Sequence, residues 1–253
     1  MSRKNNSAKV SQAKDRTSIY VAFIGLVGTV VIALVSLLNT RTQVLLPVSL
    51  TQTASVPITQ TPKSSDDDFT SDTLDSKWTW IDPLGDSRNS LTVSPGRFRI
   101  ITSGASHSFW GQNFNSPRLM QTINDDFVIK TKVYATPKVF YQGAGLLIHL
   151  DNTKWVKLQL GNLYGTSEVY LFYKNQTVET LEYSIPMQTD SVFLRLDKCG
   201  GQVTSYLSTD NINWQEIGSV TFPANEIVKT GISVENDNNA GEFFAEFDFF
   251  RCV

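Results

Sequence analysis

From residue 66 onward, the chain is a series of short runs in which apolar and polar positions alternate. The clearest run is "DFVIKTKVYA" at 126–135, where Phe127, Ile129, Thr131 and Val133 share one side. A period of two is typical of a β-strand with one face covered. Further runs of strand composition, separated by Gly, Asn, Asp and Pro, lie at 97–101, 145–150, 154–160, 168–174, 191–198, 203–208, 231–236 and 242–250. The pattern predicts an all-β antiparallel sandwich or barrel.

The amino-terminal pattern is of a different kind. No charged residue interrupts 17–40, and the apolar part from Ile19 to Leu38 is long enough for a helix to cross the hydrocarbon layer of about 30 Å. Five cations precede this segment, namely Arg3, Lys4, Lys9, Lys14 and Arg16. The positive-inside rule therefore predicts a single-pass signal-anchor in the cell membrane, with a cytoplasmic amino terminus and an extracellular carboxyl-terminal domain.

A cleaved secretory signal is the alternative to an anchor. The apolar run is longer than the 7–15 residues of a usual signal core, and the residues after it offer no good small-x-small cleavage site. Residues 40–65, rich in Thr, Ser, Gln and Pro, are typical of an extended tether. The predicted organisation is a basic tail at 1–17, a transmembrane helix at 18–39, a disordered linker at 40–65 and one β-domain at 66–253.

Composition limits the partners and the cofactors. The net charge is −2, so the chain lacks the basic character of nucleic-acid-binding proteins. Its two cysteines, Cys199 and Cys252, are too few for a four-cysteine zinc site. Outside the cytoplasm they can form a disulfide that fixes the carboxyl terminus, which is the prediction here, and two free thiols are the alternative.

Four segments carry a resemblance to a known family: "DDDFTSDTLDSKWTWIDP" at 66–83, "PRLMQTINDDFVIKTKV" at 117–133, "YQGAGLLIHLDNTKWVKLQL" at 141–160 and "AEFDFFRCV" at 245–253. Together they resemble the concanavalin A-like jelly rolls. More narrowly, they are similar to the bacterial domain of unknown function 1349 and to the sandwich domain at the carboxyl end of family 43 β-xylosidases. The resemblance implies two curved antiparallel sheets and a concave face that holds sugar in many relatives.

Such jelly rolls often bind one calcium ion between the first and last strands. Asp66, Asp68 and Asp248 would be its oxygen ligands here, although an acidic run at a domain edge is often simply solvated. We predict no cofactor, with calcium as the alternative.

The sequence does not contain the carboxylates of a glycosidase on this fold. Retaining enzymes with this jelly roll often carry Glu-x-Asp followed by a second Glu, whereas here Glu246 and Asp248 are followed by Arg251. We therefore predict that these two carboxylates form the polar side of the closing strand and that the chain has no catalytic residue. His149 lies within an apolar strand, where a packed neutral imidazole is expected.

Aromatic residues in polar surroundings are the candidate ligand contacts, because sugar rings stack on Trp and Tyr. Trp110 has turn-forming and amide neighbours, Gln112 and Asn113, that offer hydrogen bonds to hydroxyl groups. The alternative is that Trp110 closes one end of the sandwich.

A second candidate group lies on the two strands around 150. Trp155 and Lys157 share a face by their spacing, and Tyr141 and Gln142 begin the preceding strand. The sequence thus predicts a membrane-anchored carbohydrate-binding or adhesion module that contacts a polysaccharide or glycoconjugate. A glycan-active hydrolase and a structural ectodomain that binds a protein are the alternatives.

Overall fold

The computed structural model describes residues 65–239 and 241–253. The predicted tail, the predicted transmembrane helix and all but the last residue of the linker lie outside these residues. Within the described part of the chain, no helix is long and apolar enough to span a membrane.

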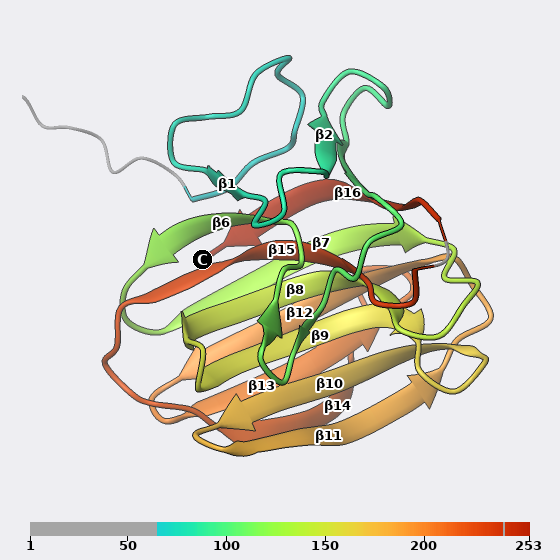
Figure 1. Cartoon of the computed structure of the whole chain (residues 1–253). Helices are drawn as coiled ribbons and strands as arrows, with labels where there is room; N and C mark the ends of the chain where they lie inside the picture. The colour runs from blue at the N-terminus through green and yellow to red at the C-terminus, as the bar shows by residue number, and fades with distance from the viewer. Residues whose placement is uncertain (1–64, 240) are drawn as a thin grey trace, which may run out of the picture. The chain divides into compact units, whose positions relative to one another are not determined.

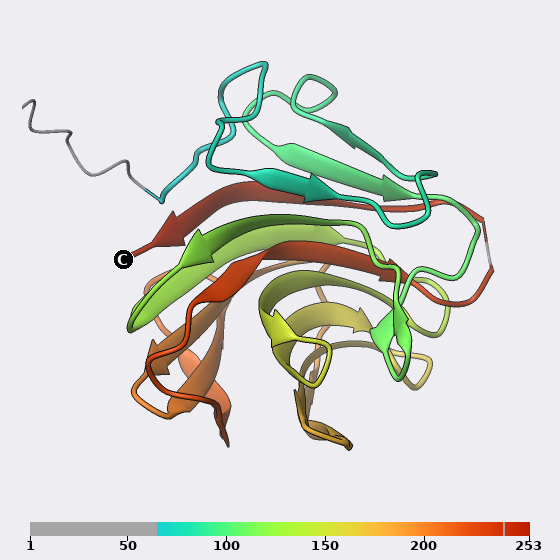
Figure 2. The same cartoon turned by 60° about the vertical axis from the view of Figure 1, so that its left-hand side comes forward.

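Two seven-stranded antiparallel sheets make up the β-domain, as Figures 1 and 2 show. The first sheet has the order β1 (Thr79–Ile81), β6 (Arg118–Ile123), β15 (Val228–Asn236), β8 (Gln142–Asp151), β9 (Lys154–Asn162), β10 (Ser167–Asn175), β11 (Val178–Pro186). The second has the order β14 (Gln215–Thr221), β13 (Gln202–Ser208), β12 (Ser191–Cys199), β7 (Phe127–Ala135), β16 (Phe243–Cys252), β3 (Phe98–Thr102), β2 (Arg88–Ser90). The predicted all-β two-sheet sandwich is confirmed.

Strand β7 shows why these sequences form this fold. Its burial alternates along the whole strand, and Ile129 and Val133 are fully buried while Lys130 and Lys132 are only partly covered. The buried side chains join residues of the first sheet, such as Leu146 and Leu158, in one core between the sheets. Each large aliphatic side chain buried there contributes about 1.5–3 kcal/mol.

The first sheet is covered on both faces in its centre. A short hairpin, β4 (Phe109–Trp110) and β5 (Asn113–Phe114), lies against its outer face in front of β8 and β9 (Figure 1). Under the hairpin is a second apolar cluster made of Phe109, Met120, Leu147, Trp155, Leu163, Tyr170 and Phe172. This second cluster positions the candidate site.

The predicted disulfide is wrong, because Cys199 and Cys252 are both free. Cys252 pairs with Ile129 of β7, which in turn pairs with Leu196 of β12, so two strand spacings of about 5 Å each separate Cys252 from β12. Cys199 lies further along β12 and is exposed, whereas Cys252 packs against the core. A disulfide requires Cα atoms within about 7 Å.

The closing strand, β16, carries Glu246 on its polar side, as predicted. Glu246 forms ion pairs with Arg97 at 3.0 Å and with Arg99, and it accepts a hydrogen bond from Ser94. Burial raises the pKa of Glu246, but the hydrogen bonds from Ser94 and the two arginines outweigh it, so the pKa is lowered. Glu246 is therefore a carboxylate held by two guanidinium groups.

Candidate functional site

The hairpin β4–β5 turns at Gly111 and Gln112, and Trp110 pairs with Asn113 across it. Gly111 has a φ of 62°, a conformation in which a side chain would be strained. A glycine at the first central position is typical of the type II′ turn, whose twist suits a two-residue hairpin. The turn therefore projects Trp110 over the first sheet.

Two buried Lys–Glu pairs hold this hairpin by its backbone. Lys157 Nζ is 2.8 Å from each carboxylate oxygen of Glu235 and donates to the carbonyl of Phe109 at 3.0 Å. Glu235 accepts the backbone N–H of Phe109 at 3.3 Å. The pair therefore binds both backbone groups of a single residue.

The second pair repeats this arrangement two residues later. Lys174 Nζ is 2.8 Å from Glu179 and donates to the carbonyl of Gly111 at 3.1 Å. Glu179 accepts the N–H of Gly111 at 2.9 Å. Trp110 lies between the two bound residues, so its backbone is fixed on both sides.

The ring of Trp110 packs on the outer face of the first sheet. Its centroid lies 4.9 Å from that of Phe172 and 6.3 Å from that of Trp155, both in edge-to-face geometry. Trp155 is fully buried below it, while Trp110 is 39% exposed. Edge-to-face aromatic pairs of this kind add about 0.5–1.5 kcal/mol to the burial of apolar area.

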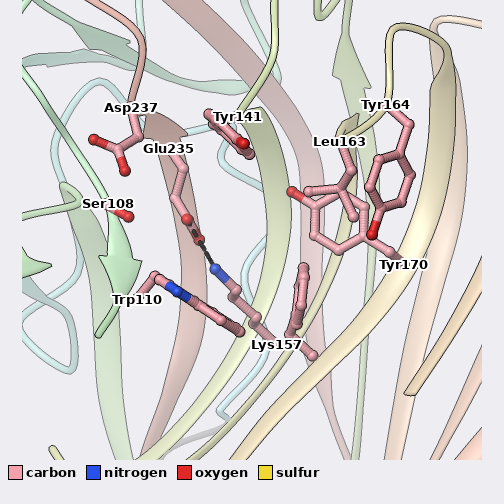
Figure 3. Close-up of a pocket in the computed structure, with 10 residues that line it drawn as sticks. Ser108, Trp110, Tyr141, Lys157, Leu163, Tyr164, Tyr170, Glu235 and Asp237 are labelled. Atoms are coloured by element: carbon pink, nitrogen blue, oxygen red, sulfur yellow. Dashed lines mark hydrogen bonds and ion pairs between the residues drawn. The ribbon is translucent and has the colours of Figure 1, made fainter. Parts of the chain in front are cut away.

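A pocket of about 380 Å³ opens beside Trp110 (Figure 3). Its walls are Ser108, Trp110, Tyr141, Lys157, Leu163, Tyr164, Tyr170, Phe172, Glu235 and Asp237. The Lys157–Glu235 pair lies between Trp110 and the Tyr164 side of the pocket, and Asp237 and Tyr141 lie at one end of it (Figure 3). The pocket thus combines five aromatic rings with three charged groups.

Tyr141 reaches the pocket through an unusual backbone conformation. Its φ is 64°, in the left-handed region that bulky residues seldom adopt. The conformation is held by the N–H of Tyr141, which donates to Asn162 at 2.7 Å, and by its carbonyl, which accepts from the N–H of Asp237 at 3.1 Å. Strain of this kind is concentrated at ligand sites.

Glycines in β8 and β9 make room for Tyr170. A Cβ atom at Gly143 would lie 2.3 Å from the hydroxyl oxygen of Tyr170, and one at Gly161 would lie 2.7 Å from it. The hydroxyl donates to Gln159 at 2.9 Å. Burial, with Glu235 and Glu168 nearby, raises the pKa of Tyr170 well above its usual value, so the hydroxyl keeps its proton.

Three of the predicted ligand residues, Trp110, Tyr141 and Lys157, line the pocket together. Trp155 shares the face of Lys157 as predicted, but it is fully buried beneath the hairpin instead of facing the pocket.

The three predicted amide residues have other positions. Gln142 is buried, and its side chain binds the N–H of Lys138 at 2.8 Å. Asn113 donates to Ser106 at 3.0 Å, and Gln112 is exposed at the turn. None of these three amides lines the pocket.

Several pocket residues were not predicted from the sequence. Glu235 was detectable as the polar outer position of the run 231–236, but its pairing with Lys157 spans 78 residues. Tyr164 lies in the loop between β9 and β10 and is 71% exposed. Its Gly, Asn, Thr and Ser neighbours meet the criterion applied to Trp110, so the sequence did carry a signal for it.

The predicted calcium ligands do not come together. Arg251 forms ion pairs with Asp66 at 3.9 Å and with Asp68. In the described ranges, no group of three or more His, Cys, Asp and Glu residues is arranged to hold a metal ion. The acidic run is therefore paired with a guanidinium group of the closing strand.

His149 is packed against the hairpin. Its ring lies 5.2 Å from Phe109 in edge-to-face geometry. Burial, reinforced by the positive charge of Arg118, lowers the pKa of His149 to about 4. The imidazole is therefore neutral at pH 7, as the apolar strand predicted.

Two packed seven-stranded antiparallel sheets are the architecture of a concanavalin A-like sandwich. The sequence profile of the β-xylosidase C-terminal concanavalin A-like domain matches residues 66–252, and the chain belongs to this family. A comparison with curated proteins gives no match.

Solved structures with the same fold include the family 43 protein BlXynB of Bacillus licheniformis, at 16% identity and a TM-score of 0.68, covering 79% of this chain and 41% of that one. A xylan β-1,4-xylosidase of Bacillus halodurans has 21% identity and a TM-score of 0.59, with 74% and 38% covered. The Bacteroides ovatus protein GH43B of a xyloglucan utilisation locus has 18% identity and a TM-score of 0.61, with 76% and 40% covered. This chain therefore spans about two-fifths of the length of these proteins.

Proposed function

We propose that the protein is a carbohydrate-binding or adhesion module without catalytic turnover, anchored in the cell membrane by residues 18–39 and displayed outside the cell. The observation that carries the proposal is the pocket of about 380 Å³. That volume lies in the range of small-molecule sites. The partner is a polysaccharide or glycoconjugate.

The aromatic walls support a saccharide ligand. Trp110 and Tyr164, which are 39% and 71% exposed, offer ring faces to the C–H surface of a sugar. Asp237 and Ser108 supply acceptors for hydroxyl groups at the same pocket. Because the Lys–Glu pairs fix the backbone on both sides of Trp110, little conformational entropy is lost when a ligand binds there.

Membrane anchorage and export rest on the amino-terminal sequence. An uncharged apolar stretch of membrane-spanning length follows five cations. Labelling of intact cells with a membrane-impermeant amine reagent tests this arrangement. Modification of the domain only after lysis would contradict an extracellular position.

The binding proposal is tested by applying the full chain, purified in mild detergent, to an array of plant, fungal and bacterial glycans. Trp110→Ala and Tyr164→Ala should each weaken binding at least tenfold. Tyr164 is highly exposed, so its loss should leave the fold intact. Phe244→Ala is the matched control, because Phe244 is 51% exposed and belongs to β16 of the second sheet. Binding to no glycan, or equal losses in all three variants, would refute the proposal.

A further inference from the structure

The charge of the pocket indicates which saccharides it accepts. Lys157 uses its ammonium donors on Glu235 and on the carbonyl of Phe109, at 2.8–3.0 Å. Its side chain is only 3% exposed. Lys157 is the one cation among the residues that line the pocket, so no cationic donor there is free for a carboxylate, sulfate or phosphate.

Asp237 leaves the pocket with a net negative charge. Lys157 and Glu235 cancel, and Asp237 adds a second carboxylate to the walls. Asp237 accepts a hydrogen bond from the hydroxyl of Ser106. None of the ion pairs in the described part of the chain includes Asp237. A partly buried carboxylate without a counterion favours a cationic ligand group.

The aromatic walls add to this preference. The face of an aromatic ring attracts cations, and Lys157 already lies 5.3 Å from the centroid of Phe172. Trp110, Tyr141 and Tyr164 are the exposed rings around the opening. Figure 3 places Asp237 close to Tyr141 at one end of the pocket. Aromatic rings around a carboxylate are a typical receptor for an organic ammonium group.

We propose that the pocket binds an amino sugar with a free, protonated amine, such as a glucosamine unit of a deacetylated polysaccharide. The sugar ring stacks on Trp110 or Tyr164 and the ammonium group faces Asp237. This inference rests on the proposed saccharide-binding function and names its ligand class. A uronic acid or a sulfated sugar would instead meet Asp237 and Glu235 with like charge.

The test is calorimetric titration of the full chain at pH 6 with the glucosamine trimer, its N-acetylated form and a glucuronate-containing oligosaccharide. N-acetylation removes the charge but keeps the ring. The glucosamine trimer should bind at least tenfold more tightly than the N-acetylated trimer, and added salt should reduce this ratio. Asp237→Asn should abolish the ratio. Glu226→Gln, an equal change of charge at an exposed loop position, should leave it unchanged.

The outcomes separate this inference from the function on which it rests. Equal binding of the charged and acetylated trimers, or preference for the glucuronate ligand, would refute the ammonium site while saccharide binding stands. If Asp237→Asn and Glu226→Gln reduce the ratio equally, the preference arises from overall charge and the assignment of Asp237 is wrong. No binding of any saccharide would overturn both proposals.

Discussion

Substitution of Lys157 tests directly how much the buried Lys157–Glu235 pair under the hairpin contributes to stability. The two side chains are only 3% and 7% exposed. In Lys157→Met, Glu235 keeps the N–H of Phe109 but loses its cation, and the carbonyl of Phe109 loses its donor. Removing one partner of a buried pair costs about 3–5 kcal/mol. We expect a loss of that size in the free energy of unfolding.

A surface pair of shorter distance is the control. Arg88 and Glu242 lie 2.6 Å apart, but their side chains are 62% and 61% exposed. Exposed pairs contribute about 0.2–1 kcal/mol, so Arg88→Met should cost no more than that. The assay is urea unfolding of the full chain followed by tryptophan fluorescence, because Trp155 lies 5.5 Å from Lys157 Nζ.

The double variant Lys157→Met/Glu235→Met separates charge from backbone contacts. Replacing both charges with apolar groups should recover much of the loss. Recovery should remain incomplete, because the N–H and C=O of Phe109 then lack partners, at about 1–3 kcal/mol each. If Lys157→Met and Arg88→Met cost the same, the reasoning from burial is refuted.

Three further predictions concern titration and thiol reactivity. Because its pKa is lowered from 4.5, Glu246 stabilises the fold at neutral pH, and Glu246→Gln should lower the free energy of unfolding at pH 7. This difference in free energy between variant and wild type should shrink as the pH falls below about 4.5. A constant difference would contradict this. By NMR, the imidazole of His149 should titrate near pH 4. The free energy of unfolding should fall from pH 6.5 towards pH 4, because the unfolded state takes up the proton first. An NMR titration midpoint near pH 6.5 would show that the imidazole is not buried. Iodoacetamide should label Cys199 in the native protein but Cys252 only after unfolding, because burial and the nearby Asp66 raise the pKa of Cys252 to about 12. A mass increase on reduction alone would indicate a disulfide.

Local periodicity predicted nine of the sixteen strands in the described part of the chain, and it missed β1, β2, β4, β5, β6, β11 and β14. The alternation in 126–135 placed Ile129 and Val133 in the core, and both are fully buried. The spacing of Trp155 and Lys157 also placed them on the same face of β9. Each of these predictions depends only on neighbours along one strand, where side-chain direction follows position.

Contacts between distant strands could not be predicted in the same way. The burial of Trp155 depends on a hairpin more than forty residues earlier in the chain, and Lys157 meets a carboxylate 78 residues away. The cysteine prediction failed because it assumed that the ends of β12 and β16 meet, whereas β7 lies between them. Strand order across a sandwich is set by the whole fold and is not encoded in any one segment.

The backbone hydrogen bonds that hold the hairpin affect how the ligand specificity of this domain can change by mutation. Within the hairpin, both Lys–Glu pairs form hydrogen bonds only with main-chain atoms, those of Phe109 and Gly111. The side chain of Trp110, which lies between them, takes part in none of these hydrogen bonds. A substitution at this position can therefore alter recognition while the support beneath it stays in place, so new specificities can arise here without rebuilding the sandwich.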